Sequence, residues 1–514
     1  MGGEISTTLD TLPIESTLEG RVLPFQGAIS EAWRFVVAAL LIPLLPTLLW
    51  FWQSHSWLYL RGWIDMDYML LLGIAFLYPS RAMIGVLTAE MCIALLEPIA
   101  HLFYFSPSSA LLSLRYLQYI PLQRLMVYAV VVFAYTLVSA AVLRVILGTH
   151  RRKSAQKMVV ALVVCGMIGV TTDLFRGRLN QFSLGLQLGT VDVREKRIVR
   201  APGASLLQSI YIETRHANIP SHPIDSTLSR TIAGFPDGSK PNIVLVLTES
   251  WGQANDDRIN QAQIDPYRNP AISSLYRVQT GDAPFVGGTT SGETRELCGD
   301  SWGFSSINGP DSFFTRCWPS LLNRAGYRTL AVHGFTPGMF KRGDWYRRFG
   351  FQNSAFMPEL LHDGATMCDG AFPGICDADV ATWIGNRLQT DRDGKPTFIH
   401  WVTLNSHIPV PPLEEILSPK QCAVVGIEQQ ESLCSWFMRV LRVQESVARL
   451  ALTPGLRPTV FVIVGDHAPP FLRVDTRNQF SPTRVPFVVL IPRSIKLQPQ
   501  ASEQPLMADI SSSK

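Results

Sequence analysis

The stretch Asn242-Ile-Val-Leu-Val-Leu-Thr248, which runs directly into Glu249, decides the fold of the C-terminal half of the chain. A short apolar run rich in β-branched residues is typical of a strand buried in a parallel sheet. In open parallel sheets, ligands bind just beyond the carboxyl ends of the strands. Glu249 therefore occupies a position at which a ligand-binding side chain is expected.

Three further apolar runs end in the same way, on side chains that bind metals or phosphate. They are 327–332 before His333, 397–404 before His407, and 460–464 before Asp466 and His467. Two carboxylates with an imidazole suit Zn²⁺ or Mn²⁺ and leave a position open for substrate. Because four runs end in this way, the sequence predicts a metal-assisted active site with Glu249, Asp466 and His467 as ligands.

Helical stretches alternate with these runs, which indicates a mostly parallel sheet flanked by helices on both faces. The helical stretches are 319–325, 378–388 and 434–450, and the last predicted strand is 485–492. We therefore expect an α/β catalytic domain at 241–500. The flanking segments are a connector at 177–240, with one surface helix near 206–213, and a disordered tail at 501–514.

The apolar residues, 47% of the 514, are concentrated before residue 176. That part contains five runs, each close to the ~20 apolar residues that a helix needs to cross a bilayer. The runs are 33–53, 58–79, 82–106, 122–147 and 156–175. We therefore expect a cytoplasmic segment at 1–30 and a bundle of five transmembrane helices at 31–176.

The orientation of these helices follows from the basic cluster His150-Arg151-Arg152-Lys153, which lies between the fourth and fifth runs. Basic residues concentrate in cytoplasmic loops, so the N-terminus is assigned to the cytoplasm and everything after residue 176 to the outside. Arg115 and Arg124 fall on the outer side and depart from the rule. Residues 1–30 lack the pattern of a cleavable signal peptide, so the first helix is expected to act as the targeting signal.

Six of the eight cysteines follow the last predicted helix. An even number in an exported domain indicates disulfides, and pairing of nearest neighbours is the simplest arrangement. The expected pairs are Cys298–Cys317, Cys368–Cys376 and Cys422–Cys434. The alternative is a structural zinc site, which the lack of any C-x₂-C pair disfavours. The chain has a net charge of +4 and no basic run suited to nucleic acid, so we expect no nucleic-acid partner.

A glycine-rich loop, 287–293, reads Gly-Gly-Thr-Thr-Ser-Gly-Glu and offers three hydroxyls in a row. Glycines allow the backbone to approach a ligand closely, and a bound dication lowers the pKa of a hydroxyl so that it can act as a nucleophile. The alternative is an ordinary surface turn, since loops of this composition are common.

The strand-end residues Glu249, His333, His407, Asp466 and His467, together with the loop 287–293, resemble in their order along the chain the motifs of the alkaline phosphatase/sulfatase superfamily. The closest likeness is to its membrane-bound phosphotransferases: lipoteichoic acid synthases, periplasmic glucan phosphoglycerol transferases and lipid A phosphoethanolamine transferases. The resemblance implies that Thr290, in Thr290-Ser-Gly-Glu, is the nucleophile, because Cys298 follows it by eight residues as in the ethanolamine branch. It also implies one divalent metal, Zn favoured over Mn, held by Glu249, Thr290, Asp466 and His467.

The stretch 333–350, from His333-Gly-Phe to Phe-Gly350, resembles a substrate-binding segment of the synthases. This implies that His333 and Arg342 hold the substrate phosphate, for which the planar guanidinium is well suited. Phe340 or Trp345 would line the pocket.

The segment Leu404-Asn-Ser-His407-Ile-Pro409 resembles the family element whose His binds the transferred group.

The sequence also departs from the family pattern at two places. Cys317-Trp-Pro-Ser-Leu321 lacks the Arg of the sulfatase maturation motif, so Cys317 is interpreted as a disulfide cysteine. After His467 comes Ala-Pro-Pro-Phe rather than the His-Gly of the ethanolamine enzymes, which leaves the head group open.

The resemblance implies a multi-pass protein of the bacterial inner membrane with a periplasmic catalytic domain. The expected activity is transfer of a phospholipid head group, phosphoethanolamine or phosphoglycerol, through a phosphothreonine onto an envelope glycan or lipid. A polysaccharide-synthesis complex is a further candidate partner. A membrane-tethered hydrolase of phosphate or sulfate esters and a non-catalytic scaffold remain the alternatives.

Two further residues are given other interpretations. His400 is interpreted as a packed core histidine, and Glu293 as a metal neighbour or a residue that orients the loop.

Overall fold

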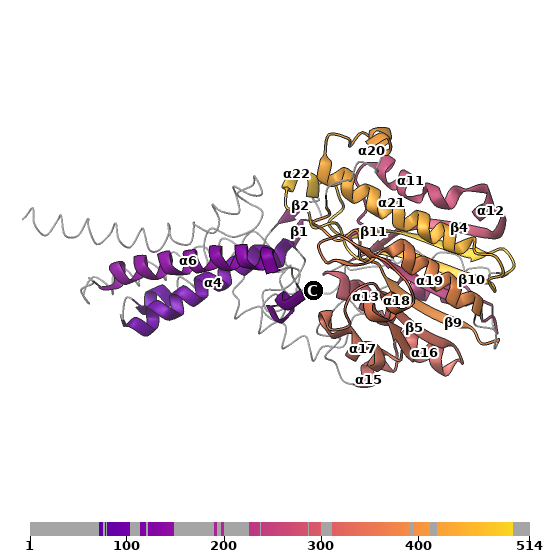
Figure 1. Ribbon diagram of the computed structural model, residues 1–514, viewed down its shortest axis with the longest axis horizontal. Helices are drawn as coiled ribbons and strands as arrows, with labels where there is room; N and C mark the ends of the chain where they lie inside the picture. The colour runs from indigo at the N-terminus through magenta and orange to yellow at the C-terminus, as the bar shows by residue number, and fades with distance from the viewer. Residues whose placement is uncertain are drawn as a thin grey trace, which may run out of the picture.

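The computed structural model consists of a C-terminal α/β domain from which two long helices extend side by side (Figure 1). These helices are α4 (Arg81–Leu102) and α6 (Leu122–Gly148), and the short 3-10 helix η2 (Leu114–Tyr119) lies between them in the chain. The described residues are 71–75, 78, 80–102, 114–119, 122–148, 190–192, 197–199, 226–236, 238–285, 287–299, 311–390, 394–411 and 419–496.

The domain is built on a seven-stranded sheet in the order β4-β11-β10-β3-β9-β5-β6. The five strands from β10 to β6 are parallel, whereas β11 is antiparallel to both of its neighbours. Every residue of β3, β9 and β10 is buried, as expected for central strands that are covered on both faces. The strands are β3 (Asn242–Thr248), β4 (Tyr276–Pro284), β5 (Arg328–His333), β6 (Asn353–Ala355), β9 (Thr397–Val402), β10 (Thr459–Gly465) and β11 (Arg484–Pro492).

Two groups of helices pack against this sheet, each held together by contacts among its own members. One group comprises α11 (Asp257–Ile264), η3 (Asp265–Arg268), α19 (Asp377–Thr390), α20 (Pro419–Val425) and α21 (Glu431–Ala451). The other comprises α10 (Thr227–Ala233), α13 (Thr289–Cys298), α15 (Asp311–Phe314), α16 (Trp318–Arg324) and α17 (Arg342–Phe349). The remaining helices are α12 (Pro270–Leu275), η4 (Met339–Lys341), α18 (Met357–His362) and α22 (Val474–Arg477). The predicted mostly parallel sheet flanked by helices is confirmed.

The strands at the two edges of the sheet were not predicted. β4 contains Gly, Asp and Pro, and its central residues are exposed, so it lacks an apolar run. β6 is only three residues long and largely exposed. Two short antiparallel pairs were also missed, β1 (Thr190–Asp192) with β2 (Arg197–Val199) and β7 (Met367–Cys368) with β8 (Gly374–Ile375).

Two of the five predicted membrane helices fall within the described residues. The run 82–106 corresponds to α4, and the run 122–147 corresponds to α6. Within the part of the chain that the structure describes, one stretch, 125–144 of α6, is long and apolar enough to cross a membrane. The runs 33–53 and 156–175 and most of 58–79 lie outside the described residues, as do the segment 1–30, the basic cluster, the helix near 206–213 and the tail.

All three nearest-neighbour disulfides are formed. They are Cys298–Cys317, Cys368–Cys376 and Cys422–Cys434. The first joins the end of α13 to the start of α16, so Cys317 is a disulfide cysteine as predicted. The connector also contributes an element that was not predicted, because α10 packs against α13 and the Leu228 amide donates a hydrogen bond to the buried Glu296 carboxylate.

Candidate metal and nucleophile site

Glu249, Asp466 and His467 come together at the carboxyl end of the sheet, as their positions after two strands predict. Strands β3 and β10 are paired neighbours in which Thr248 is in register with Gly465, so the residues that follow them meet. One ligand atom from each of the three side chains lies within 4.8 Å of the others. Nε2 of His467 is 3.3 Å from Oδ2 of Asp466 and 3.5 Å from Oε1 of Glu249.

Ser250 fixes both carboxylates, although its sequence position gave no signal for this. Its backbone has a φ of 55°, in the left-handed region that residues other than glycine rarely adopt. In this conformation its amide donates to Oδ1 of Asp466 at 2.7 Å, and its hydroxyl donates to Oε1 of Glu249 at 2.7 Å. Strain of this kind is concentrated at functional sites.

The charges of these three residues fit a divalent cation. Burial, followed by the nearby Glu249 carboxylate, raises the pKa of Asp466 well above its usual value. Burial opposes ionisation of Glu249 too, but His407 and His467 outweigh it and lower the pKa of that carboxyl. Oδ2 of Asp466 is buried and accepts no hydrogen bond from the described residues. A dication would satisfy this oxygen and neutralise the two facing carboxylates.

The tautomer of His467 also fits a metal ligand. Its Nδ1 is 2.9 Å from the carbonyl of Ala468, which can only accept, so Nδ1 carries the proton and Nε2 presents its lone pair to the carboxylates. Burial lowers the pKa of His467 and favours this neutral form, although Glu249 opposes the effect. A second ring nitrogen held by a backbone carbonyl is typical of metal-ligating histidines.

The hydroxyl beside these three residues belongs to Thr289 rather than to Thr290. Oγ1 of Thr289 donates to Oε2 of Glu249 at 3.1 Å and lies 3.4 Å from Nε2 of His467. Thr289 is half-buried, whereas Thr290 is 3% exposed and, within the described part of the chain, makes no hydrogen bond to Glu249, Asp466 or His467. The assignment of Thr290 as nucleophile and ligand therefore stays a prediction, and Thr289 is the better-placed candidate.

Helix α13, which begins at Thr289, is joined closely to the end of β10. A Cβ added at Gly292 would lie 3.0 Å from Cβ of Asp466, so glycine permits this approach. Arg295 is buried and donates to the carbonyls of Gly465 at 2.7 Å and Asp466 at 3.3 Å. The charge of Arg295 is paired with buried Glu296 at 2.7 Å. Helix α13 and the end of β10 are thus held as one unit.

Replacing Arg295 with Met should destabilise the protein by about 3–5 kcal/mol, because it leaves the buried Glu296 carboxylate without its positive partner and removes a donor from the carbonyls of Pro284, Gly465 and Asp466. Denaturant unfolding followed by tryptophan fluorescence would measure the loss. Arg258→Met is a matched control, since the Arg258–Asp256 pair is exposed and should contribute nothing measurable. Equal stability of the two variants would contradict the prediction.

Arg342, expected to hold phosphate, is bound to the buried carboxylate of Glu293. Its Nε and Nη2 lie 3.1 Å and 3.0 Å from Oε2 of Glu293. The Tyr346 hydroxyl donates to Oε1 of Glu293 at 2.5 Å, and Nε2 of His400 lies 3.4 Å from the same oxygen. Burial opposes ionisation of Glu293, but Arg342 and His400 outweigh it and lower its pKa to about 2. Glu293 therefore anchors Arg342, and His400 is a core histidine within this network.

His333 and His407 share the tautomer of His467. Nδ1 of His333 is 3.0 Å from the carbonyl of Val402, and Nδ1 of His407 is 2.7 Å from that of Ile408. Burial lowers the pKa of His333 to about 3, with a further contribution from Arg342, and burial also lowers the pKa of His407. Each neutral ring thus offers an Nε2 lone pair, which accepts a proton or a hydrogen bond from a ligand.

Phe340 and Trp345 have different surroundings. Trp345 is 1% exposed and packs against Tyr346 and Phe349, so it belongs to the core and does not line an open pocket. Phe340 is half-buried, and its ring lies 5.3 Å from the guanidinium carbon of Arg342. Of the two aromatic candidates, Phe340 is the one beside the expected phosphate-binding residues.

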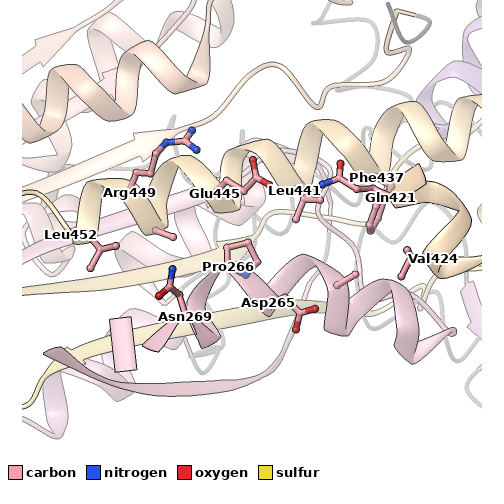
Figure 2. A pocket seen from close by; sticks show the side chains of 12 residues that line it. Asp265, Pro266, Asn269, Gln421, Val424, Phe437, Leu441, Glu445, Arg449 and Leu452 are labelled. Atoms are coloured by element: carbon pink, nitrogen blue, oxygen red, sulfur yellow. The ribbon is translucent and has the colours of Figure 1, made fainter. Parts of the chain in front are cut away.

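A separate cavity of about 470 Å³ lies between α21 and the helices α11, η3 and α20 (Figure 2). Its walls include Asp265, Phe437, Leu441 and Glu445 and none of the strand-end residues. This cavity is therefore separate from the group of side chains at the strand ends.

A model of the sulfatase family matches residues 241–509, more than half of the chain. The chain belongs to the sulfatase family. No curated protein matches it. This family membership confirms the resemblance to the superfamily drawn from the motifs.

Three solved structures that resemble this chain are of transferases or synthases. The lipooligosaccharide phosphoethanolamine transferase A (EptA) of Neisseria meningitidis is 12% identical, with a TM-score of 0.51 over 83% of this chain and 80% of that one. The lipoteichoic acid synthase LtaP of Listeria monocytogenes is 13% identical (TM-score 0.35; 54% and 70% covered). The phosphoglycerol transferase GacH of Streptococcus pyogenes is 16% identical (TM-score 0.34; 51% and 72% covered). At these identities the likeness to EptA supports the fold.

Proposed function

We propose that this protein is a membrane-anchored phosphotransferase that moves a phospholipid head group onto an envelope glycan or lipid through a phosphothreonine. The observation that carries the proposal is the Thr289 hydroxyl, hydrogen-bonded to Glu249 and close to His467 at the carboxyl end of the sheet. Membership of the sulfatase family and the names of its transferase neighbours support this reaction class.

In the first step, Oγ1 of Thr289 attacks the phosphorus of the lipid phosphodiester, and the bond from phosphorus to the diacylglycerol oxygen breaks. The hydroxyl proton leaves toward Glu249, its hydrogen-bond acceptor. Diacylglycerol departs with the proton that Glu249 has accepted, which returns Glu249 to the carboxylate, and the head group remains as a phosphothreonine diester. In the second step, an acceptor hydroxyl displaces Thr289 from phosphorus, and the neutral Nε2 of His333 or His407 accepts the proton of that hydroxyl. The displaced Thr289 oxygen takes up one proton, which restores the hydroxyl, and the imidazole is neutral again once its own proton is lost.

Glu249, Asp466 and His467 are the residues that would hold a divalent ion, zinc or manganese. When bound, the ion supplies a lowered hydroxyl pKa and stabilises negative charge near phosphorus. Arg342 would add positive charge for the phosphate oxygens, with its guanidinium held in place by Glu293.

A lipid donor is favoured by the contact between the membrane-side helices and the site. Tyr116 in η2, between α4 and α6, packs on Phe340 with ring centroids 5.1 Å apart. Tyr119 packs on Phe335 at 6.2 Å, and a Cβ at Gly338 would collide with the Tyr119 hydroxyl. In this proposal, the segment between the two predicted membrane helices lies on the same side of the membrane as the catalytic domain. The contacts of Tyr116 and Tyr119 with that domain support a donor located at the bilayer surface.

The proposal predicts that a protein beginning near residue 200 keeps its metal and cleaves a small soluble phosphodiester but loses most activity toward lipid. The loss is expected because the helices no longer hold the site at the bilayer, where the effective concentration of donor is high. Full-length and shortened proteins would be compared on lipid vesicles and on a soluble diester. Equal activity on vesicles would favour the hydrolase alternative.

Incubation with mixed phospholipids followed by mass spectrometry tests the reaction itself. A head-group phosphodiester on the loop 287–293 would identify the transferred group. Release of free head-group phosphate without transfer to an added glycan or lipid would instead support hydrolysis.

A further inference from the structure

The hairpin β7–β8, closed by the Cys368–Cys376 disulfide, lies against both strand ends that carry the expected substrate histidines. On one side it contacts the residue after His333, because the Ile375 amide donates to the carbonyl of Gly334 at 2.8 Å. The approach is close, since a Cβ at Gly334 would lie 3.1 Å from the Ile375 carbonyl oxygen.

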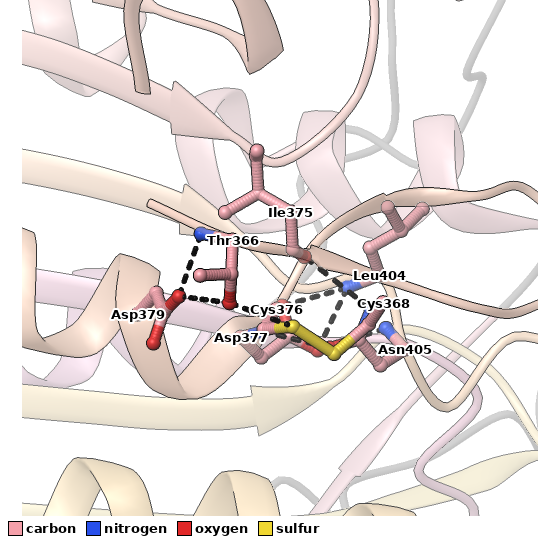
Figure 3. Close-up of a disulfide and its surroundings, with 8 residues drawn as sticks. All are labelled: Thr366, Cys368, Ile375, Cys376, Asp377, Asp379, Leu404 and Asn405. Atoms are coloured by element: carbon pink, nitrogen blue, oxygen red, sulfur yellow. Dashed lines mark hydrogen bonds between the residues drawn. A yellow bond between two sulfur atoms is a disulfide. The ribbon is translucent and has the colours of Figure 1, made fainter. Parts of the chain in front are cut away.

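On its other side the hairpin is bonded to the loop that carries His407 (Figure 3). The carboxylate of Asp377, 3% exposed, accepts hydrogen bonds from the Leu404 amide at 3.0 Å and the Asn405 amide at 2.8 Å. In return the Asp377 amide donates to Oδ1 of Asn405 at 2.7 Å. Nδ2 of Asn405 donates to the carbonyl of Ile375 at 3.3 Å. Cys376 of the disulfide lies between Ile375 and Asp377, the two residues that make these hydrogen bonds.

The tip of the hairpin reaches the imidazole itself. Phe372, between the two cysteines, packs edge-to-face on the ring of His407, with centroids 4.8 Å apart and planes at 81°. The ring of Phe372 also packs on Phe335, just after β5, with centroids 5.5 Å apart. Phe372 is half-buried and packs at the edge of a small apolar cluster that includes Phe335 and Leu404. An aromatic ring in this position restricts the rotation of the imidazole.

We propose that the disulfide-closed hairpin is a positioning element for His407, anchored by Asp377 and acting through the ring of Phe372. The role rests on the proposed function, in which His407 contacts the transferred group or accepts a proton. Asp377 holds the backbone of the loop, and Phe372 holds the orientation of the imidazole. The disulfide limits the conformations of the seven residues between its cysteines, so the tip stays against His407.

The experiment uses the full-length protein and three variants, Asp377→Asn, Phe372→Leu and Phe372→Tyr. Hydrogen exchange of the peptide covering 403–408 should be at least about tenfold faster in Asp377→Asn, because the amide of Asn would present a donor to one of the two backbone N–H groups. For Phe372→Leu, kcat/KM for the lipid donor should fall by about 10- to 100-fold, since small misplacements of a substrate-contacting group are costly. Metal content should not change, and Phe372→Tyr, which keeps the ring, should retain activity.

Asp379→Asn is the matched control. Asp379 lies in the first turn of the same helix, but its carboxylate accepts hydrogen bonds from Thr366, the residue before β7, and among the described residues none from the loop that carries His407. It should leave both exchange and kcat/KM unchanged. Unaltered exchange in Asp377→Asn, or unaltered kcat/KM in Phe372→Leu, would overturn the proposal. A wild-type protein without transferase activity would count against the proposed function, and the exchange data would still decide whether Asp377 holds the loop.

Discussion

Thr289→Ala should reduce turnover by several orders of magnitude, whereas Thr290→Ala should retain much of the activity. The first substitution removes the hydroxyl that contacts Glu249 and His467, and with it the covalent step. The second removes a buried hydroxyl one residue further along α13, which affects packing at the start of the helix. Activity toward lipid vesicles would be measured for both variants, with the metal content determined alongside.

Thr289→Ser provides the chemical control, because it keeps a hydroxyl at the same position. Mass spectrometry after incubation with donor lipid should find the modified residue at 289 in wild-type protein and no modification in Thr289→Ala. A dead Thr290→Ala variant with modification at 290 would instead support the assignment made from the Thr290-to-Cys298 spacing. The two outcomes are distinct, since the threonines differ in both burial and contacts.

The central part of the fold was predictable because its strands carry the full hydrophobic signal. β3, β9 and β10 are buried along their whole length, so their sequences are continuous apolar runs. Edge strands have no such requirement, and β4 and β6 were missed for this reason. Disulfide pairing was predictable because each cysteine pairs with its neighbour in sequence, 8 to 19 residues away.

The sequence predicted only those site residues that directly follow a strand. The grouping of Glu249, Asp466 and His467 follows from the register of two adjacent strands. The choice between Thr289 and Thr290 depends on which side chain of the first helical turn faces the strand ends, and spacing to a distant cysteine does not reveal this. The ion-pair partners of Arg295 and Arg342 could not be predicted either, because the sequence does not show whether an arginine is buried or exposed.

Asp466→Asn should abolish tight metal binding and nearly all activity while leaving the local geometry in place. Asn keeps an Oδ1 that accepts from the amides of Ser250 and His467, each now 2.7 Å from the Asp466 carboxylate. What it lacks is the charge on Oδ2, the oxygen that accepts no hydrogen bond from the described residues. Elemental analysis should find about one Zn or Mn per wild-type chain and much less in the variant. Asp475→Asn, at an exposed position, is the control and should bind metal normally.

The thermal stability of the same proteins separates loss of a ligand from loss of structure. A bound metal stabilises only the folded state, by about 4 kcal/mol when the free ion is at 1,000 times its Kd. Wild-type protein should therefore melt at a higher temperature with metal than after chelation, and Asp466→Asn should show no such difference. Without metal, the variant should be at least as stable as wild type, because it no longer buries a carboxylate facing Glu249. If the chelated variant melts well below chelated wild type, Asp466 has a structural role. If wild-type protein free of metal is active, the metal-assisted mechanism is excluded.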